Sequence, residues 1–303
     1  MYVQEFTKKK KKTPYPNVKE LKGIATSKTE ALQNDGIIAK NIVPPELIEE
    51  ESRLALEAGI DFEILRKQTV IKYDIEKYKF QEAIAEALAI PKEFSTKLGS
   101  LHETSLLPVA EASSGRGYRG HGTEWIKRWK SGQLINTPQH CNQYYSKLYL
   151  KLLQELILPY INDPRGICFQ RDPTFRCHIA GDPLPTGRVH CDADYGHSTA
   201  EINFWIPFSS TVYGSNSIYC ESAPGAGDYN SFDMEYGEIM CFWGSQCNHY
   251  TVPNTSNVTR ISVDFRVLPR SLYDMTDMPG SHFAIGGFFG HMFTDPEGNV
   301  VIQ

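Results

Sequence analysis

The sequence lacks any apolar run long enough to cross a membrane, and its first thirty residues contain no signal-peptide core. It also lacks the positive charge of a general nucleic-acid binder: 31 Lys and Arg stand against 36 Asp and Glu, a net charge of −5. These absences predict a soluble, intracellular, cytoplasmic protein whose partner is a small-molecule substrate, with no nucleic acid and no membrane. Nothing in the sequence indicates the oligomeric state.

Paired cysteines are missing as well. The seven cysteines are an odd number, and no two of them form a Cys-x-x-Cys motif. This spacing suits neither a disulfide framework nor a zinc knuckle. We therefore expect reduced and mostly buried thiols.

With 303 residues and 41% hydrophobic residues, the chain can bury a substantial core. Residues 1–25 contain a run of five lysines and are expected to form a mobile basic arm. Residues 26–303 are expected to form a single domain. Its parts are a mostly helical layer over 26–163, a β-rich core over 164–269 and a C-terminal extension over 270–303.

Apolar spacing and prolines predict the elements of the first half. We expect a strand over 36–43, followed by a helix that starts at Pro44 and Pro45. Further helices are expected over 73–90 and 137–160. These helices are expected to brace the outside of a sheet.

The stretch 113–122 is too rich in glycine for a regular element. It carries Arg116, Tyr118, Arg119 and His121, and loops on a rigid scaffold commonly supply substrate contacts. We take Arg116 and Arg119 as candidate substrate-binding residues. The alternative is a surface loop held by its own hydrogen bonds.

After residue 164, short segments with strand character are separated by Gly, Pro, Asn and Asp. Eight short strands at this spacing are typical of a double-sheet jelly roll. Strands are expected near 167–171, 174–180, 187–192, 200–207, 216–220, 238–243, 247–252 and 259–267.

Polar and apolar side chains alternate along the last of these strands. One face carries Arg260, Ser262, Asp264 and Arg266, and the other carries Ile261, Val263, Phe265 and Val267. Since successive side chains of a strand point to opposite faces, the apolar face is expected to pack on the helices. The polar face is then left to line a cavity.

The motif His190-Cys-Asp192 is the candidate centre of the chemistry. On an extended strand both side chains would point the same way, so that they could hold two adjacent corners of one metal ion. His-x-Asp occurs once in this chain of nine histidines. By itself it is equally compatible with a hydrogen-bonded pair at a strand end.

Further candidates follow in a fixed order. Between Asp192 and His249 lie 56 residues, and ten more separate His249 from Arg260, with Ser262 two positions on. Two histidines and one carboxylate leave half an octahedron open, the arrangement of non-haem Fe(II) oxygenases. The arginine and the serine offer an anchor for a carboxylate nearby.

In this ordered set the chain resembles the Fe(II)/2-oxoglutarate-dependent dioxygenases. It is similar to the branch that contains phytanoyl-CoA hydroxylase and the oxygenases of natural-product pathways, over roughly residues 164–269. Further marks of the resemblance are the segments 194–197, 201–207, 216–225 and 236–238. The resemblance implies a double-stranded β-helix core, of the jelly-roll or cupin-like type, braced by N-terminal helices.

The resemblance also implies the cofactors and the residues that hold them. Fe(II) would be bound by His190, Asp192 and His249. The distal carboxylate of 2-oxoglutarate would be bound by Arg260 with Ser262 assisting, and O2 would take the last metal position. The co-substrate 2-oxoglutarate would be converted to succinate.

Other residues are placed near the site by strand parity. Arg188 would share a face with His190, where it would bind a substrate carboxylate or pair with Asp264 or Glu201. Asn203 is a candidate for orienting the metal-binding end of 2-oxoglutarate. Tyr195, at the rim, and Trp205, on the same face as Asn203, are candidates for substrate contact.

The sequence thus predicts an Fe(II)/2-oxoglutarate-dependent oxygenase that activates C–H bonds of a small, carboxylate-bearing substrate derived from an amino acid. The specific hypothesis is oxidative cyclisation of an N-prenylated glutamate, as in algal kainoid synthases. A second hypothesis is a hydroxylase of an aminoglycoside-like or other small metabolite, for which Glu201 and Asp264 could bind amines. A jelly-roll isomerase or hydrolase would use the same metal ligands without needing Arg260, and a non-catalytic metal-binding module would need no co-substrate.

Overall fold

The computed structural model describes residues 45–88, 90–104, 143–181, 187–274, 276 and 279–303. The predicted basic arm, the strand over 36–43 and the glycine-rich stretch with Arg116, Tyr118, Arg119 and His121 lie outside the described residues.

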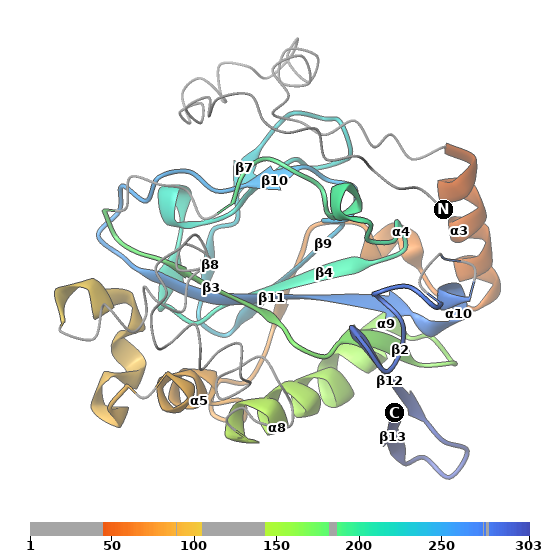
Figure 1. Ribbon diagram of the computed structural model, residues 1–303, viewed down its shortest axis with the longest axis horizontal. Helices are drawn as coiled ribbons and strands as arrows, with labels where there is room; N and C mark the ends of the chain where they lie inside the picture. Colours follow the sequence, from red (N-terminus) through yellow and green to blue (C-terminus); the bar gives the residue numbers. More distant parts are fainter. Residues whose placement is uncertain (1–44, 89, 105–142, 182–186, 275, 277–278) are drawn as a thin grey trace.

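A large antiparallel sheet forms the centre of the described chain (Figure 1). Its longest strand, β11, is buried along its whole length and pairs with β4 on one side and with β2 and β3 on the other. The strand order is β1 (Thr69–Lys72), β9 (Glu238–Phe242), β4 (Ile202–Pro207), β11 (Arg260–Pro269), β2 (Ile167–Gln170), β12 (Phe289–Thr294) and β13 (Val300–Ile302), with β3 (Thr174–His178) beside the first half of β11.

A smaller sheet forms a second layer and contributes a metal-ligand candidate. It contains β10 (His249–Tyr250), β6 (Tyr219–Cys220) and β7 (Asn230–Ser231) in that order. His190 extends it through an antiparallel bridge to His249. A two-stranded ribbon, β5 (Thr211–Val212) with β8 (Met234–Glu235), and the 3-10 turn η5 (Gly214–Asn216) complete the connections.

Helices cover the outside of the large sheet, as predicted. In Figure 1, α5 (Phe80–Ala87) and α8 (Gln143–Leu152) lie on the side of β11 that faces away from the small sheet. The helix of α8 continues through the π-helical turn η3 (Leu153–Ile157) into α9 (Leu158–Ile161). The remaining helices are α3 (Pro45–Glu57), α4 (Phe62–Leu65), the 3-10 segment η1 (Lys92–Glu103) and α10 (Arg270–Tyr273).

The alternation along β11 explains this layering. Phe265 is fully buried, stacks on Phe204 with 5.4 Å between ring centroids, and meets Tyr149 of α8 edge-on at 5.2 Å. Burying one such side chain contributes about 1.5–3 kcal/mol to folding. The apolar face therefore packs on the helices, and the polar face of β11 is turned toward the small sheet.

Four predicted elements were wrong in extent. Residues 187–192 form no strand beyond the bridge at His190, because the chain turns into the 3-10 helix η4 (Asp192–Tyr195). The helix expected over 73–90 is confined to α5, because the Asp74 carboxylate accepts the backbone N–H groups of Glu76 and Lys77 and holds a turn instead. The strands expected over 216–220 and 247–252 are also shorter, as β6 and β10.

The C-terminal segment joins the large sheet, although its glycine-rich sequence gave no strand signal. β12 pairs with β2, and Gly290 lies opposite Phe169. A Cβ atom at Gly290 would lie 2.6 Å from the Phe169 ring, so only glycine leaves room for that ring. Upstream of β12, Phe283 packs on His197 with 4.4 Å between ring centroids.

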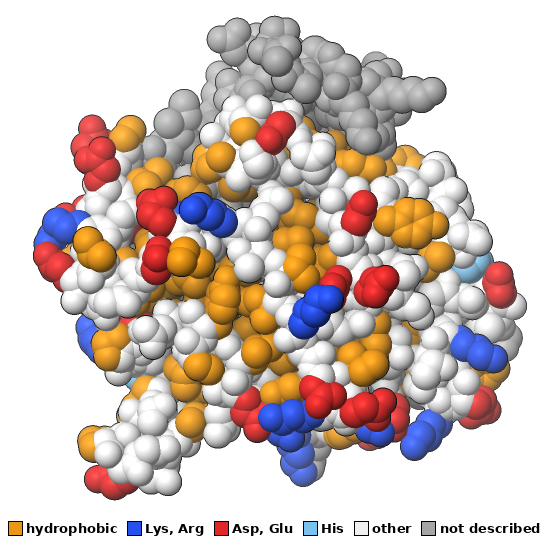
Figure 2. All heavy atoms as spheres, turned by 180° about the vertical axis from the view of Figure 1, so that it is seen from behind, with side chains coloured by type: hydrophobic (Ala, Val, Ile, Leu, Met, Phe, Trp, Pro, Cys, Tyr) orange, Lys and Arg blue, Asp and Glu red, His pale blue; other side chains and the backbone are white. Residues whose placement is uncertain are grey.

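The described chain is a mixture of helices and antiparallel sheet, which confirms the predicted class of mainly β with α. On the face shown in Figure 2, acidic and basic side chains are interspersed with exposed apolar ones. Among the described residues, no helix combines the length and apolar character required to span a membrane.

Candidate metal centre

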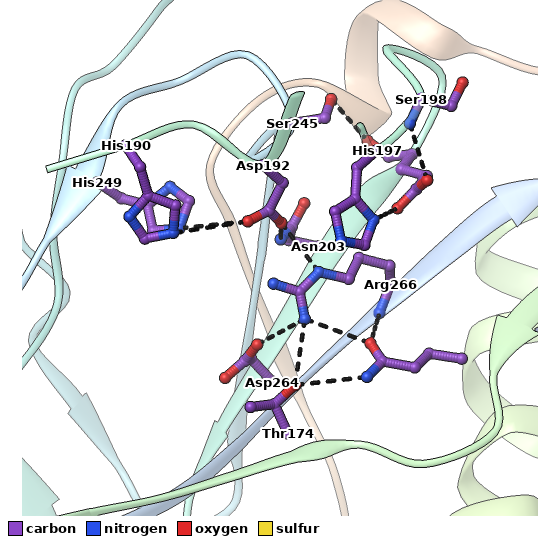
Figure 3. A network of polar contacts seen from close by, with 12 residues as sticks. Thr174, His190, Asp192, His197, Ser198, Asn203, Ser245, His249, Asp264 and Arg266 are labelled. Carbon is purple, nitrogen blue, oxygen red and sulfur yellow. Dashed lines mark hydrogen bonds and ion pairs between the residues drawn. The ribbon is translucent and has the colours of Figure 1, made fainter. Parts of the chain in front are cut away.

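The structure brings His190, Asp192 and His249 together, with one ligand atom of each within 4.8 Å of the others. Asp192 Oδ1 lies 3.7 Å from His190 Nε2 and 3.9 Å from His249 Nε2 (Figure 3). Two bonds of about 2.1 Å to one ion can span such distances. The three side chains therefore form a two-histidine, one-carboxylate set for a single metal ion.

The backbone places these ligands differently from the predicted strand. His190 and His249 exchange backbone hydrogen bonds of 3.2 and 2.8 Å across the small sheet. Asp192 then starts η4, and its N–H donates to the Gly244 carbonyl at 2.9 Å. Asp194 Oδ2 accepts the N–H of Cys191 at 3.1 Å, which stabilises this turn. A bridge followed by a turn, and not strand parity, points both side chains to one place.

Hydrogen bonds that Nδ1–H donates to backbone carbonyls orient both imidazoles. His190 Nδ1–H donates to the Arg188 carbonyl at 2.7 Å, and His249 Nδ1–H donates to the Cys247 carbonyl at 3.0 Å. Each ring thus carries its proton on Nδ1 and turns the lone pair of Nε2 toward the cluster. Burial, together with the neighbouring His249, lowers the pKa of His190 to about 3, so this ring stays neutral.

The Asp192 carboxylate is buried and held by two donors on its other oxygen. Asn203 Nδ2 donates to Oδ2 at 2.6 Å, and Arg266 Nε donates to it at 2.9 Å. Burial alone would raise the pKa of Asp192, but the Arg266 guanidinium and the neighbouring His249 and His197 together outweigh it and hold that pKa well below its usual range. The carboxylate is therefore ionised and ready to bind a cation.

Arg266 is a residue whose role the sequence did not reveal. Parity placed it on the polar face of β11, yet no function was assigned to it. Its Nη1 also donates to Asp264 Oδ2 at 2.7 Å, and Arg176 Nε lies 3.4 Å from Asp264 Oδ1. The Asn203 amide likewise donates to the Asp192 carboxylate, whereas the sequence suggested that Asn203 orients 2-oxoglutarate.

Arg260 and Ser262 lie on the same face of β11, toward its beginning. The Arg260 side chain is fully buried, and its Nη1 donates to the Asn216 carbonyl at 3.0 Å. Burial, with the Arg176 guanidinium nearby, lowers the pKa of Arg260 to about 9. A buried cation beside a second cation is stabilised by an anion, so this end of the face suits a carboxylate.

Two buried polar atoms beside Arg260 support the same conclusion. Ser262 Oγ and Trp205 Nε1 have no hydrogen-bond partner among the described residues. Trp205 is completely buried, and the Arg260 guanidinium lies 5.7 Å from its ring centroid. Buried hydroxyl and indole groups normally have partners, so both atoms are suited to a bound ligand.

The rim residues are exposed. Arg188 is exposed, and its Nε donates to the Tyr195 hydroxyl at 3.2 Å. The Tyr195 ring in turn meets the His190 ring edge-on at 5.2 Å. Arg188 thus contacts Tyr195 at the edge of the metal centre.

The suggested pairing of Arg188 with Asp264 or Glu201 was wrong, because other partners occupy both carboxylates. Glu201 Oε2 lies 2.8 Å from His197 Nδ1, and its Oε1 accepts the N–H of Ser198 at 2.9 Å. Asp264 is engaged by Arg266 and Arg176 as described above. Both carboxylates are thus engaged by groups of the protein itself.

The residues present fit both implied cofactors. Two imidazoles that present Nε2 and one ionised carboxylate are a donor set for Fe(II). The buried Arg260 guanidinium, the Ser262 hydroxyl and the Trp205 indole offer donors to a carboxylate such as the distal group of 2-oxoglutarate.

No family model matches the chain. Among solved structures, the non-heme monooxygenase ThoJ in its nickel complex matches with a TM-score of 0.34 and 11% identity, over 68% of this chain and 75% of ThoJ. CytC3 with Fe(II) and alpha-ketoglutarate matches with a TM-score of 0.26 and 16% identity, over 35% of this chain and 46% of CytC3. AviO1 from Streptomyces viridochromogenes Tue57 matches with a TM-score of 0.33 and 10% identity, over 71% of this chain and 94% of AviO1.

All three TM-scores are below 0.5, so these matches assign no function to this chain. The family is shown by a sequence relative. The streptomycin biosynthesis protein StrG of Streptomyces griseus is 33% identical over 147 residues, 47% of this chain and 68% of StrG. The chain therefore belongs to the family of the streptomycin biosynthesis protein StrG.

Proposed function

We propose that this protein is an Fe(II)- and 2-oxoglutarate-dependent oxygenase of specialised metabolism with a double-stranded β-helix core. The observation that carries the proposal is the cluster of His190, Asp192 and His249, together with the buried Arg260 and Ser262 on the strand whose Arg266 holds Asp192. The metal ligands support a non-haem iron site, and the guanidinium supports a co-substrate with a carboxylate.

The arrangement of the two sheets supports the jelly-roll core. His249 comes from the small sheet, whereas Arg266, which holds Asp192, comes from the large one. The metal cluster thus lies between two antiparallel layers. A site inside such a layered core is shielded from water by both sheets.

The protein's own residues would bind, orient and protect the reactants. Bound Fe(II) and 2-oxoglutarate together supply the oxidation of a C–H bond by O2, with 2-oxoglutarate converted to succinate and CO2. Arg260 and Ser262 would hold the distal carboxylate of the co-substrate, and the buried face around Trp205 would exclude water from it. Arg188 and Tyr195 would meet the substrate at the rim.

We further propose a small substrate that bears a carboxylate. Arg188 at the rim offers a cationic partner, whereas the carboxylates of Glu201 and Asp264 are already paired within the protein. Oxidative cyclisation of an N-prenylated glutamate is one specific form of this hypothesis. Hydroxylation of an aminoglycoside-like metabolite is the alternative, favoured by the similarity to a streptomycin biosynthesis protein.

A succinate-release assay tests the proposal. The Fe(II)-loaded protein is incubated with 2-oxoglutarate, O2 and either N-prenylated glutamate or an aminocyclitol, and the masses of the products are measured by mass spectrometry. Loss of two hydrogens indicates cyclisation, and gain of one oxygen indicates hydroxylation. Conversion of either compound without consumption of 2-oxoglutarate would instead indicate the isomerase or hydrolase. Metal binding without turnover of any member of a broad substrate panel, and without succinate, would indicate the binding module.

A further inference from the structure

Two side chains of the large sheet donate hydrogen bonds to Asp192, and both bonds end on the same oxygen atom. Asn203 Nδ2 and Arg266 Nε donate to Oδ2, at 2.6 and 2.9 Å. A carboxylate oxygen offers about two lone-pair positions, so two donors fill Oδ2. The other oxygen, Oδ1, is the one that faces Nε2 of His190 and of His249. The two oxygens of this carboxylate are therefore not equivalent.

We propose that Asn203 and Arg266 are positioning residues that restrict Asp192 to binding the metal through Oδ1 alone. The inference rests on the proposed function and adds the reason why the metal keeps enough open positions. A carboxylate that bound through both oxygens would occupy a fourth position of an octahedron. One-oxygen binding leaves three positions, the number that 2-oxoglutarate and O2 require together.

The surroundings of both donors show that their places are built into the fold (Figure 3). Asn203 is buried, and a Cβ atom at Gly244 would lie 2.6 Å from its Cγ, so glycine leaves the room that this amide needs. Arg266 is held by Asp264, whose Oδ2 accepts its Nη1 at 2.7 Å. Gln170 Oε1 also accepts the Arg266 backbone N–H at 3.2 Å. Neither donor is free to rotate away when a metal arrives.

The test uses Co(II) as a spectroscopic metal and needs no 2-oxoglutarate. Asn203→Leu removes one donor without changing charge, and Arg266→Lys keeps the charge but loses the directed Nε–H. Each variant should bind Co(II) about 10- to 100-fold more weakly than the wild type, the usual effect of removing a partner of a metal ligand. Each should also change the visible spectrum of bound Co(II), because the coordination of Asp192 changes.

Asn254→Leu is the matched control. Asn254 is a buried asparagine whose amide donates to the carbonyls of His178 and Val258, at 3.1 and 2.9 Å. The Asn254→Leu variant should have a lower melting temperature than the wild type, whereas its Co(II) affinity and the spectrum of its bound Co(II) should be unchanged. If Asn203→Leu does not fold, Gly244→Ala displaces the same amide and takes its place in the comparison.

Wild-type Co(II) affinity and spectrum in both Asn203→Leu and Arg266→Lys would overturn the inference, and so would a wild-type protein that binds no Co(II) at this cluster. The proposed function fails separately. A wild type that binds Co(II), but whose Fe(II) form makes no succinate from 2-oxoglutarate, would refute the oxygenase and leave the measured role of the two donors standing.

Discussion

Replacing Arg260 by lysine perturbs the proposed co-substrate site while keeping its positive charge. The guanidinium is fully buried and donates from Nη1 to the Asn216 carbonyl, and a guanidinium at such a site can form a two-pronged contact with a carboxylate. Lysine keeps the charge but loses one of the two hydrogen bonds of that bidentate contact. A hydrogen bond to a charged group contributes about 1.5–3 kcal/mol. At about 1.4 kcal/mol per factor of ten, the KM for 2-oxoglutarate should rise about 10- to 150-fold.

The assay measures succinate release against 2-oxoglutarate concentration at saturating substrate, and then against substrate at saturating 2-oxoglutarate. The KM for substrate should change far less than the KM for 2-oxoglutarate. Arg171→Lys is the control, because the Arg171 guanidinium donates to the Gly286 carbonyl at the surface. An unchanged 2-oxoglutarate dependence in Arg260→Lys would refute the assigned role of this guanidinium.

Three further outcomes are expected. His249→Ala should abolish Fe(II) binding and turnover while circular dichroism shows a folded protein, and near-normal activity at low iron would contradict the ligand assignment. Asp172→Asn should raise the free energy of unfolding by about 1 kcal/mol at pH 7, because burial raises the pKa of Asp172 to about 6 and partial exposure limits the effect. Since the folded state then binds more protons than the unfolded state between about pH 4 and 6, wild-type stability should fall as pH rises through that window, and denaturation curves of the variant should lose this slope. Glu51→Leu removes the carboxylate that lies 3.0 Å from the buried Arg66 guanidinium, and it should lower the free energy of unfolding, measured by urea denaturation, by about 3–5 kcal/mol. The double variant Glu51→Leu with Arg66→Met should lose less stability, because it leaves no buried charge without its ion-pair partner.

The alternation of polar and apolar side chains along β11 could be predicted from the sequence, because this strand is long and pairs with other strands on both sides. Its polar side chains face the small sheet and its apolar ones face α8, as parity requires. The grouping of His190, Asp192 and His249 was also predicted, from their order along the chain. The strand geometry expected for the motif was wrong, because Asp192 lies in a 3-10 turn that Asp194 stabilises.

Other features depend on long-range contacts that spacing does not encode. Arg266 was placed on the correct face, but its hydrogen bond to Asp192 joins residues 74 positions apart in the sequence. The β12–β13 hairpin was missed because Gly290 reads as a strand breaker, although it is the residue that admits the Phe169 ring. A signal for Arg266 was nevertheless present: a cation on a cavity-facing strand requires a buried anion nearby.

The central claim is that one bound Fe(II) is chelated by 2-oxoglutarate beside Arg260. The most direct test is an anaerobic titration of the Fe(II)-loaded protein with 2-oxoglutarate, followed by the visible absorption that arises when this keto acid chelates Fe(II). We expect a saturable band at one 2-oxoglutarate per chain, absent in His249→Ala and shifted to higher 2-oxoglutarate concentration in Arg260→Lys. Tight Fe(II) binding with no such band at any 2-oxoglutarate concentration would contradict the claim.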